Sequence, residues 1–219
     1  MHDKDALVST MLASIDAAQQ SDQPYRHWLV SECLPAPMLG SVLALPFEAP
    51  ALEGVSGKRE LHNATRKYFD AENQKSFPVC AQFCAAFQDP RLTDRIAGRF
   101  GAVLGGTYLR VEYAQDIDGF WLEPHTDLGV KTFTMLLYIS NDPQHQSLGT
   151  DIYDLDKTPV GRSPFLPNSA FIFVPSSTTY HGFERRTIDG VRKSIIINYV
   201  TNEWRAREQL AFPDRPIAT

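Results

Sequence analysis

The chain has 219 residues, of which 43% are hydrophobic and 21% charged, a composition typical of a globular protein with one substantial core. Its formal net charge of -5, without a dense run of lysine or arginine, argues against binding to the phosphate backbone of nucleic acids. No apolar run reaches the roughly 18–20 residues that span a bilayer, so we expect no membrane association. The three cysteines cannot all pair, which favours reduced thiols and a cytoplasmic protein.

The N-terminal part of the chain predicts helices and one short strand. Apolar residues recur at helical spacing over residues 5–19, and further helices are expected over 35–45, 78–87 and 91–100. His27–Val30 has the composition of a strand. The polar segment 50–77 has two interpretations, a solvated connection or a lid over a substrate site, with residues 62–69 as the candidate lid.

From Thr107 onward the pattern is typical of strands. Residues 108–113, 132–140, 149–153, 170–174 and 193–200 are rich in β-formers and separated by turn residues, and a terminal helix is expected over 202–210. We therefore predict an α+β chain, mainly β with helical support, whose core is a jelly-roll barrel. We expect a single domain, with helical support and a possible lid over 1–105, the jelly roll over 106–201, and a C-terminal helix and tail over 202–219.

The most informative stretch runs from Glu123 to Asp127. His125 and Asp127 are two residues apart in a segment rich in β-formers, so in extended backbone both side chains leave the same face. His181 follows 56 residues later, directly after a strand-like apolar run. Two histidines and one carboxylate form the facial ligand set that suits Fe(II), because it leaves coordination positions open. The sequence therefore predicts a metal site at these three residues.

Eleven residues after His181, Arg192 opens the last predicted strand. A buried arginine can hold a carboxylate through two parallel hydrogen bonds, which a lysine cannot reproduce. Strand parity places Ser194 and Asn198 on the same face as Arg192, and directs Lys193, Ile195, Ile197 and Tyr199 toward the outer, helix-covered face.

These motifs, His-x-Asp, a distal histidine after a strand, and Arg-x-Ser opening the next strand, resemble the 2-oxoglutarate and Fe(II)-dependent dioxygenases. The resemblance is greatest to the prolyl-hydroxylase-like branch and covers roughly residues 106 to 201. It implies a cupin-like double-stranded β-helix in which Fe(II) is bound by His125, Asp127 and His181, with 2-oxoglutarate and O2 as co-substrates. The residues expected to hold 2-oxoglutarate are Arg192, Ser194, Tyr138, Tyr113 and Asn198.

The resemblance further implies hydroxylation of an unactivated C–H bond, with succinate and CO2 as co-products. Members that halogenate have a small residue in place of the carboxylate, so Asp127 argues against halogenation, whereas desaturation and ring formation stay open. Arg66, Tyr68 and Trp121 are candidate contacts to the primary substrate, which could be a small molecule, a carrier-bound group or a protein side chain.

Two other classes of protein are compatible with parts of this pattern. One is a non-catalytic, cupin-like metal-binding protein, which would have no need of a distant carboxylate clamp at Arg192 and Ser194. The other is a purely structural barrel, in which His125 and His181 bind nothing. The sequence leaves the oligomeric state open.

Overall fold

The computed structural model describes residues 3–50, 66–127 and 129–218. The α-helices in these ranges are α1 (Lys4–Asp16), α2 (Ala36–Leu43), α4 (Ala71–Ser76), α5 (Pro78–Phe87) and α6 (Pro90–Phe100). The strands are β1 (Gln19–Ser21), β2 (His27–Val30), β3 (Lys67–Tyr68), β4 (Tyr108–Asp116), β5 (Leu122–His125), β6 (Lys131–Tyr138), β7 (Asp151–Tyr153), β8 (Pro159–Arg162), β9 (Ser169–Phe173), β10 (His181–Phe183) and β11 (Arg192–Val200). In the same ranges, 3-10 turns cover Pro143–Ser147 and Arg207–Gln209.

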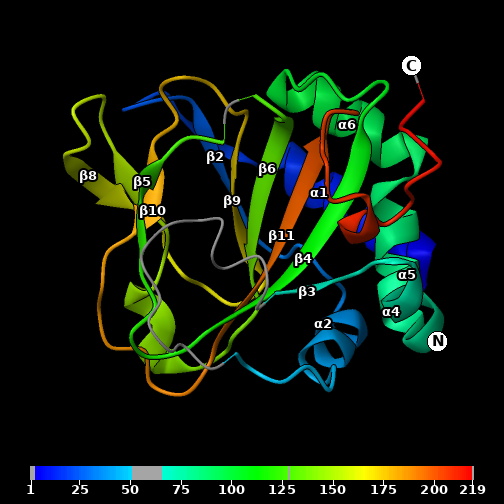
Figure 1. Ribbon diagram of the computed structural model, residues 1–219, viewed down its shortest axis with the longest axis horizontal. Coiled ribbons are helices and arrows are strands. Elements are labelled where there is room, and N and C mark those ends of the chain that lie inside the picture. Colours follow the sequence, from blue (N-terminus) through cyan, green and yellow to red (C-terminus); the bar gives the residue numbers. More distant parts are fainter. Residues whose placement is uncertain (1–2, 51–65, 128, 219) are drawn as a thin grey trace.

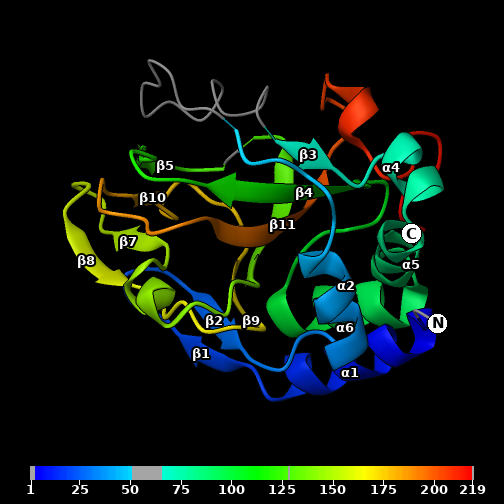
Figure 2. The same ribbon diagram turned by 90° about the horizontal axis from the view of Figure 1, so that it is seen from below.

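Among the described residues the strands form two antiparallel sheets. The larger has the order β1-β2-β9-β6-β11-β4-β3 and the smaller the order β5-β10-β7-β8. Figure 1 and Figure 2 show the smaller sheet on one side of the larger sheet and the helices on its other side. This arrangement confirms the predicted mainly β architecture with helical support. None of the described helices is long and apolar enough to cross a bilayer.

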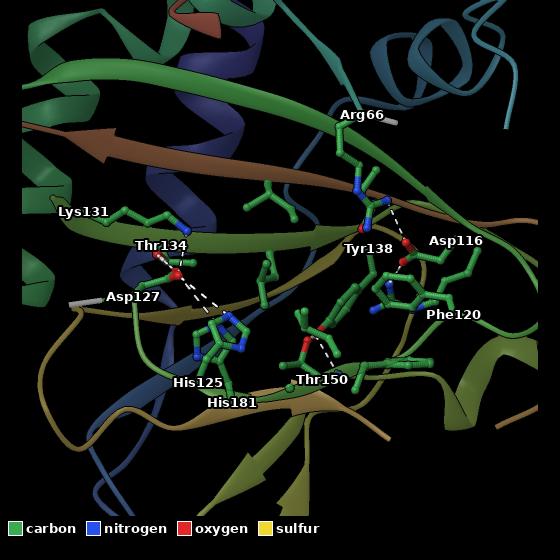
Figure 3. A pocket seen from close by; sticks show the side chains of 18 residues that line it. Arg66, Asp116, Phe120, His125, Asp127, Lys131, Thr134, Tyr138, Thr150 and His181 are labelled. Carbon is green, nitrogen blue, oxygen red and sulfur yellow. Dashed lines mark hydrogen bonds and ion pairs between the residues drawn. The ribbon is translucent and has the colours of Figure 1, made fainter. Parts of the chain in front are cut away.

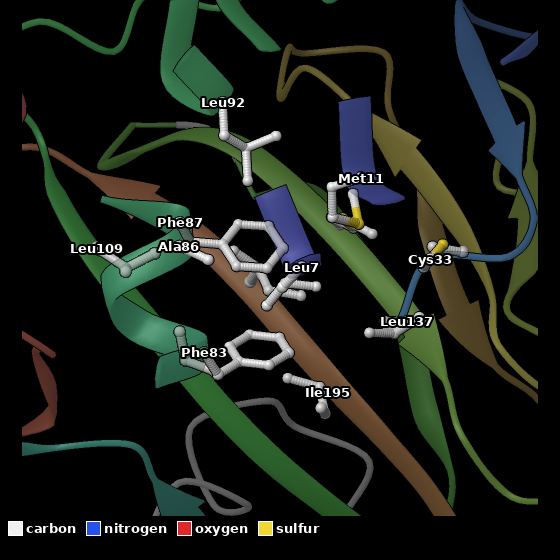
Figure 4. Packing of buried hydrophobic residues seen from close by; sticks show 14 of the residues in the cluster. Leu7, Met11, Cys33, Phe83, Ala86, Phe87, Leu92, Leu109, Leu137 and Ile195 are labelled. Atoms are coloured by element: carbon white, nitrogen blue, oxygen red, sulfur yellow. The ribbon is translucent and has the colours of Figure 1, made fainter. Parts of the chain in front are cut away.

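The main hydrophobic core lies between the larger sheet and the helices. Leu7 and Met11 of α1 and Phe83 of α5 pack there with Leu137 and Ile195 of the sheet, as Figure 4 shows. The alternation of side chains along a strand explains this placement, because every second residue of β11 points toward the helices. Ile195, Ile197 and Tyr199 all belong to this core, as the strand parity predicted.

A second, smaller cluster occupies the space between the two sheets. Tyr138, Phe165, Phe171, Phe173 and Ile152 pack together there with Tyr25. These residues come from strands of both sheets and from the connections beside them. The interior of the jelly roll is therefore apolar at this point, and the polar pocket described below lies next to it.

The predicted terminal helix over 202–210 is wrong, because the segment forms bends and one 3-10 turn instead. Its side chains serve as partners for the fully buried Arg110. The Trp204 ring lies 4.8 Å from the Arg110 guanidinium, and the Gln209 side-chain oxygen accepts a hydrogen bond of 3.0 Å from Arg110 Nε. Leu210 also bridges to the backbone of Arg110. These contacts favour an extended course over a continuous helix.

The candidate lid at 62–69 lies partly outside the described residues, which resume at Arg66. From there the chain forms β3, which pairs with β4 so that Lys67 is opposite Tyr113 and Tyr68 opposite Glu112. The backbone N–H of Phe69 continues the contact by donating to Val111. Lys67 and Tyr68 therefore belong to the larger sheet, and the lid stays a prediction for the residues before Arg66, which lie outside the described ranges.

Candidate metal centre and adjoining pocket

The three predicted metal ligands come together at one end of the pocket between the sheets. His125 of β5 and His181 of β10 are register partners in the smaller sheet, and their ring centroids are 4.3 Å apart. Asp127 follows β5 by two residues; its Oδ1 lies 3.9 Å from His125 Nε2, and its Oδ2 lies 3.9 Å from His181 Nε2. One ligand atom from each of the three residues lies within 4.8 Å of the others. Pairing of β5 with β10 thus assembles the site.

Backbone hydrogen bonds fix which nitrogen of each histidine faces the site. His125 Nδ1 is 2.9 Å from the carbonyl oxygen of Glu123, and His181 Nδ1 is 3.0 Å from that of Thr179. Because a carbonyl oxygen only accepts, each Nδ1 carries a proton, and each neutral ring keeps its lone pair on Nε2. Both lone pairs are on the nitrogens nearest Asp127, which is the orientation that metal-binding histidines have.

Asp127 is held by two side-chain donors of the neighbouring strand β6. Lys131 Nζ donates to Oδ1 at 2.7 Å, and Thr134 Oγ1 donates to Oδ2 at 2.9 Å. Behind Thr134, Asn198 Nδ2 donates to the threonine oxygen at 3.0 Å, and Arg110 Nη1 donates to Asn198 Oδ1 at 3.1 Å. A chain of hydrogen bonds from Arg110 through Asn198 and Thr134 therefore fixes the position of the Asp127 carboxylate.

Away from the metal site, the pocket lining includes the predicted arginine, Arg192, beside Asp116 and Tyr138, which Figure 3 labels. Arg192 is buried, with Nη1 2.5 Å from Asp116 Oδ2 and Nε donating to the carbonyl oxygen of Leu148 at 2.7 Å. Ser194 and Tyr138 line the same pocket. The Tyr138 hydroxyl is 2.8 Å from the Thr150 hydroxyl, which also lines the pocket. Arginine and hydroxyl groups thus converge where the sequence predicted a carboxylate clamp.

Arg192 is the last member of a chain of buried charges along the inner face of β4. Arg66 Nη1 lies 2.7 Å from Asp116 Oδ1, and Arg66 Nε lies 3.4 Å from Glu112 Oε1. Arg110 Nη2 donates to Glu112 Oε2 at 2.7 Å. Three arginines alternate with two carboxylates, so this chain of charges carries one surplus positive charge.

Tyr113 is not in the pocket, and its predicted role in binding 2-oxoglutarate is wrong. It pairs with Ile195 across β4 and β11, and both side chains point toward the helices. Its hydroxyl donates to the carbonyl oxygen of Val42 at 3.3 Å, and burial raises the pKa of the phenol well above its ordinary value. The parity of β4 explains the error, because Glu112 and Asp116 occupy the inner face.

The other predicted site residues divide between the pocket and its surroundings. Arg66 lines the pocket beside Asp116 and Phe120. Tyr68 lines a separate outer groove, where its ring packs on Arg110 at 4.8 Å and its hydroxyl accepts from Arg110 Nη2 at 3.1 Å. Trp121 directly precedes β5 and does not belong to the described pocket lining. Asn198 acts from behind Thr134 rather than from the pocket wall.

Sequence reasoning missed four polar residues that the structure brings to the site: Asp116, Lys131, Thr134 and Thr150. One signal for Asp116 was available. Along β4 the charged residues Arg110, Glu112 and Asp116 alternate with uncharged ones, which indicates a strand with a charged inner face. Lys131 follows Asp127 by four residues without a helix, so no periodicity pointed to their contact.

Two antiparallel sheets face each other in a jelly-roll arrangement, and His125, Asp127 and His181 come together between them. No family model matches the chain, and no curated protein sequence matches it. Solved structures do match. A prolyl 4-hydroxylase from Phytophthora capsici has a TM-score of 0.60 at 12% identity, covering 94% of this chain and 68% of that one.

A Pseudomonas putida prolyl-4-hydroxylase has a TM-score of 0.58 at 16% identity, covering 90% of this chain and 99% of that one. HygX from Streptomyces hygroscopicus, solved with nickel and 2-oxoglutarate bound, has a TM-score of 0.53 at 11% identity, covering 81% of this chain and 82% of that one. The chain therefore has the fold of the 2-oxoglutarate-dependent oxygenases, and the predicted resemblance to the prolyl-hydroxylase-like branch is confirmed at the level of the fold.

Proposed function

We propose that this protein is an Fe(II)- and 2-oxoglutarate-dependent oxygenase that hydroxylates an unactivated C–H bond. One observation carries the proposal. The described pocket has three candidate metal ligands at one end, which Figure 3 shows, and at the other the buried Arg192, the last member of a chain of charges with one surplus positive charge. A non-catalytic metal-binding protein needs the first feature but not the second.

The donor set at His125, Asp127 and His181 fits Fe(II). Two neutral imidazole nitrogens and one carboxylate oxygen bind on one side of a metal ion and leave its remaining positions to small ligands. The hydrogen bonds at each Nδ1 and at both oxygens of Asp127 hold the ligands in place before metal binds. When bound, Fe(II) supplies the activation of O2 that amino-acid side chains cannot provide.

The other end of the pocket fits the far carboxylate of 2-oxoglutarate. Arg192 would pair with it, and the Tyr138, Thr150 and Ser194 hydroxyls line the same space. One carboxylate would also neutralise the single surplus positive charge of the buried chain of arginines and carboxylates. The structural neighbour HygX, whose structure contains 2-oxoglutarate, supports this assignment.

Apolar side chains cover the pocket between its two polar ends. Leu122, Leu136, Phe183 and Ile196 line it there, and all four come from strands of the two facing sheets. They exclude water from the space in which the reaction would take place, which protects the reaction from side processes. The overall conversion balances as substrate C–H plus 2-oxoglutarate plus O2 giving C–OH, succinate and CO2.

The test is 2-oxoglutarate turnover by protein reconstituted with Fe(II) under argon and then exposed to O2. We expect succinate to form slowly even without primary substrate, and to form no longer in Asp127→Ala and His181→Ala, which should also lose bound iron. His145→Gln is a matched control, because His145 is bonded to the carbonyl oxygen of Asp189 outside the pocket. Iron binding without 2-oxoglutarate binding or turnover would instead identify a non-catalytic metal-binding protein.

A further inference from the structure

We propose that Asn198 is a positioning residue for the metal site, which sets the direction of a buried row of hydrogen bonds so that the Thr134 hydroxyl donates to the Asp127 carboxylate. The proposal rests on the metal site of the proposed function and does not depend on which substrate is oxidised. It follows from the strand register, from the donors and acceptors that meet along the row, and from their burial.

Strand pairing places three polar side chains in one row across the larger sheet. On β11, which lies between β4 and β6, Asn198 is the register partner of Arg110 on β4 and of Thr134 on β6. Arg110 and Asn198 are fully buried, and Thr134 is 1% exposed. Directly opposite residues of neighbouring strands have their side chains on the same face, so these groups meet one another rather than solvent. The row ends at Asp127, which Figure 3 shows beside Thr134.

The direction of the row follows from its first member. A guanidinium group has only donors, so Arg110 Nη1 requires the oxygen of the Asn198 amide, which lies 3.1 Å away. The Asn198 Nδ2 group then faces Thr134 Oγ1 at 3.0 Å and the carbonyl oxygen of Phe133 at 3.4 Å. Because a carbonyl oxygen only accepts, the contact with Phe133 supports the same orientation of the amide. Thr134 Oγ1 thus accepts from Asn198, and its single hydrogen is left for Asp127 Oδ2, 2.9 Å away.

Contacts outside the row hold the Arg110 guanidinium in place. Its Nη2 donates to Glu112 Oε2 at 2.7 Å, and its Nε donates to Gln209 Oε1 at 3.0 Å. The rings of Tyr68 and Trp204 each lie 4.8 Å from the guanidinium. With its plane set by these partners, Arg110 keeps Nη1 directed toward β11, and the row keeps one direction.

A hydroxyl that donates to Asp127 favours metal binding. The hydrogen bond from Thr134 is charge-assisted, and it fixes the orientation of a carboxylate that must bind the metal. If the Thr134 hydroxyl donated toward β11 instead, its lone pairs would face Asp127 Oδ2, and two acceptors would repel each other. Asn198 prevents this reversal, because it presents a donor to Thr134. This contribution is separate from packing, and a substitution of the same shape can distinguish the two.

The test replaces Asn198 by aspartate, which has the same shape but two acceptor oxygens. The introduced carboxylate can still accept from Arg110, whereas Thr134 would have to donate to it. Co(II) is titrated into the protein under argon, and its visible absorption reports both affinity and ligand geometry. We expect Asn198→Asp to raise the dissociation constant of Co(II) about 10- to 100-fold and to change the spectrum of the bound ion. An added negative charge alone would act in the opposite direction, because it attracts the cation.

Three comparisons separate hydrogen-bond direction from packing and charge. Asn198→Ala removes more contacts but lets the Thr134 hydroxyl donate to Asp127, so it should weaken Co(II) binding less than Asn198→Asp does. In a Thr134→Val background, which has no hydroxyl to reverse, Asn198→Asp should cause no further weakening. Asn202→Asp adds the same charge at an exposed position and should leave Co(II) affinity unchanged. Should Asn198→Asp fail to fold, Asn198→Ala should still bind Co(II) more tightly than Thr134→Val does.

The proposal is overturned if Asn198→Asp binds Co(II) as tightly as wild type or more tightly. It is also overturned if Asn198→Ala loses as much affinity as Asn198→Asp or Thr134→Val, or if Asn198→Asp weakens binding further in the Thr134→Val background. Failure of the wild-type protein to bind Co(II) would overturn the metal site, and with it both this proposal and the proposed function. That outcome is distinguishable, because it is seen before any variant is compared.

Discussion

Replacement of Arg192 by alanine should weaken 2-oxoglutarate binding far more than metal binding. Arg192 is only 6% exposed, and its guanidinium is held by Asp116 and by the carbonyl oxygen of Leu148, so its position is set before any ligand arrives. Loss of one partner from a buried, hydrogen-bonded charge pair costs about 2–5 kcal/mol. This range corresponds to an increase of about 30- to 4,000-fold in the dissociation constant of 2-oxoglutarate.

Arg192→Lys should recover only part of this loss, because a lysine cannot contact Asp116, Leu148 and a carboxylate with one planar group. The assay is titration of 2-oxoglutarate into Mn(II)-loaded protein under argon, with metal content measured on the same samples. Arg185→Ala is the matched control, since Arg185 is exposed and follows β10 by two residues. If Arg192→Ala binds 2-oxoglutarate with wild-type affinity, Arg192 does not hold the carboxylate. If Arg192→Ala loses its metal, the metal end and the arginine end of the pocket do not act separately.

Three further predictions follow from individual contacts. Thr134→Val removes the hydrogen bond to Asp127 Oδ2 and should raise the dissociation constant of the metal about 10- to 100-fold. Thr134→Ser keeps a hydroxyl and should bind metal with near wild-type affinity. An equal loss of metal affinity in both variants, measured by metal titration, would contradict the role of this hydrogen bond. Tyr113→Phe should leave 2-oxoglutarate affinity unchanged and lower the free energy of unfolding by about 0.5–1.5 kcal/mol through loss of the bond to Val42, as denaturant titration would show. Asp89 caps α6, and its bonds to Arg91 and Lys4 hold its pKa below the ordinary value. Because the folded-state pKa of Asp89 is lowered, its contribution to the free energy of unfolding is present above the ordinary pKa of about 3.9 and disappears as the pH falls further. Asp89→Ala should therefore lower the free energy of unfolding by about 0.5–2 kcal/mol near neutral pH and by little in acid. A loss of stability that does not depend on pH would contradict this reasoning.

The cluster of His125, Asp127 and His181 could largely be predicted from the sequence because part of its arrangement depends on local geometry. Residues two apart in an extended segment share a face whatever the rest of the fold does, so His125 and Asp127 were identifiable together. The same rule placed Arg192 and Ser194 in the pocket and Ile195 and Ile197 against the helices. His181 is predicted only from the order of the motifs along the chain, because its position opposite His125 depends on strand pairing that no local pattern specifies.

The remaining parts of the site depend on contacts between distant segments. Arg66 meets Asp116 only because β3 adds to the edge of the larger sheet beside β4. The predicted polar segment 50–77, which contains β3, has no pattern that predicts this pairing. The resemblance alone places Tyr113 in the pocket, whereas the parity of its own strand, on which Glu112 and Asp116 face inward, directs it toward the helices. The contacts of Trp204 and Gln209 with Arg110, which replace the expected terminal helix, are likewise long-range.

Because His125 lies on β5, metal binding would affect the stability of the fold as well as the chemistry of the site. In the order of the described strands β5 is the outermost member of the smaller sheet and has one neighbour, β10. A metal ion joining His125 to His181 and Asp127 would fasten this edge to the interior, adding about 2.7 kcal/mol to the free energy of unfolding when free metal is at 100 times its dissociation constant. Removal of the metal by a chelator should therefore make β5 the first part of the protein that unfolds and is cleaved by proteases. Under the proposed function, loss of Fe(II) would then shorten the lifetime of the protein as well as stop its turnover.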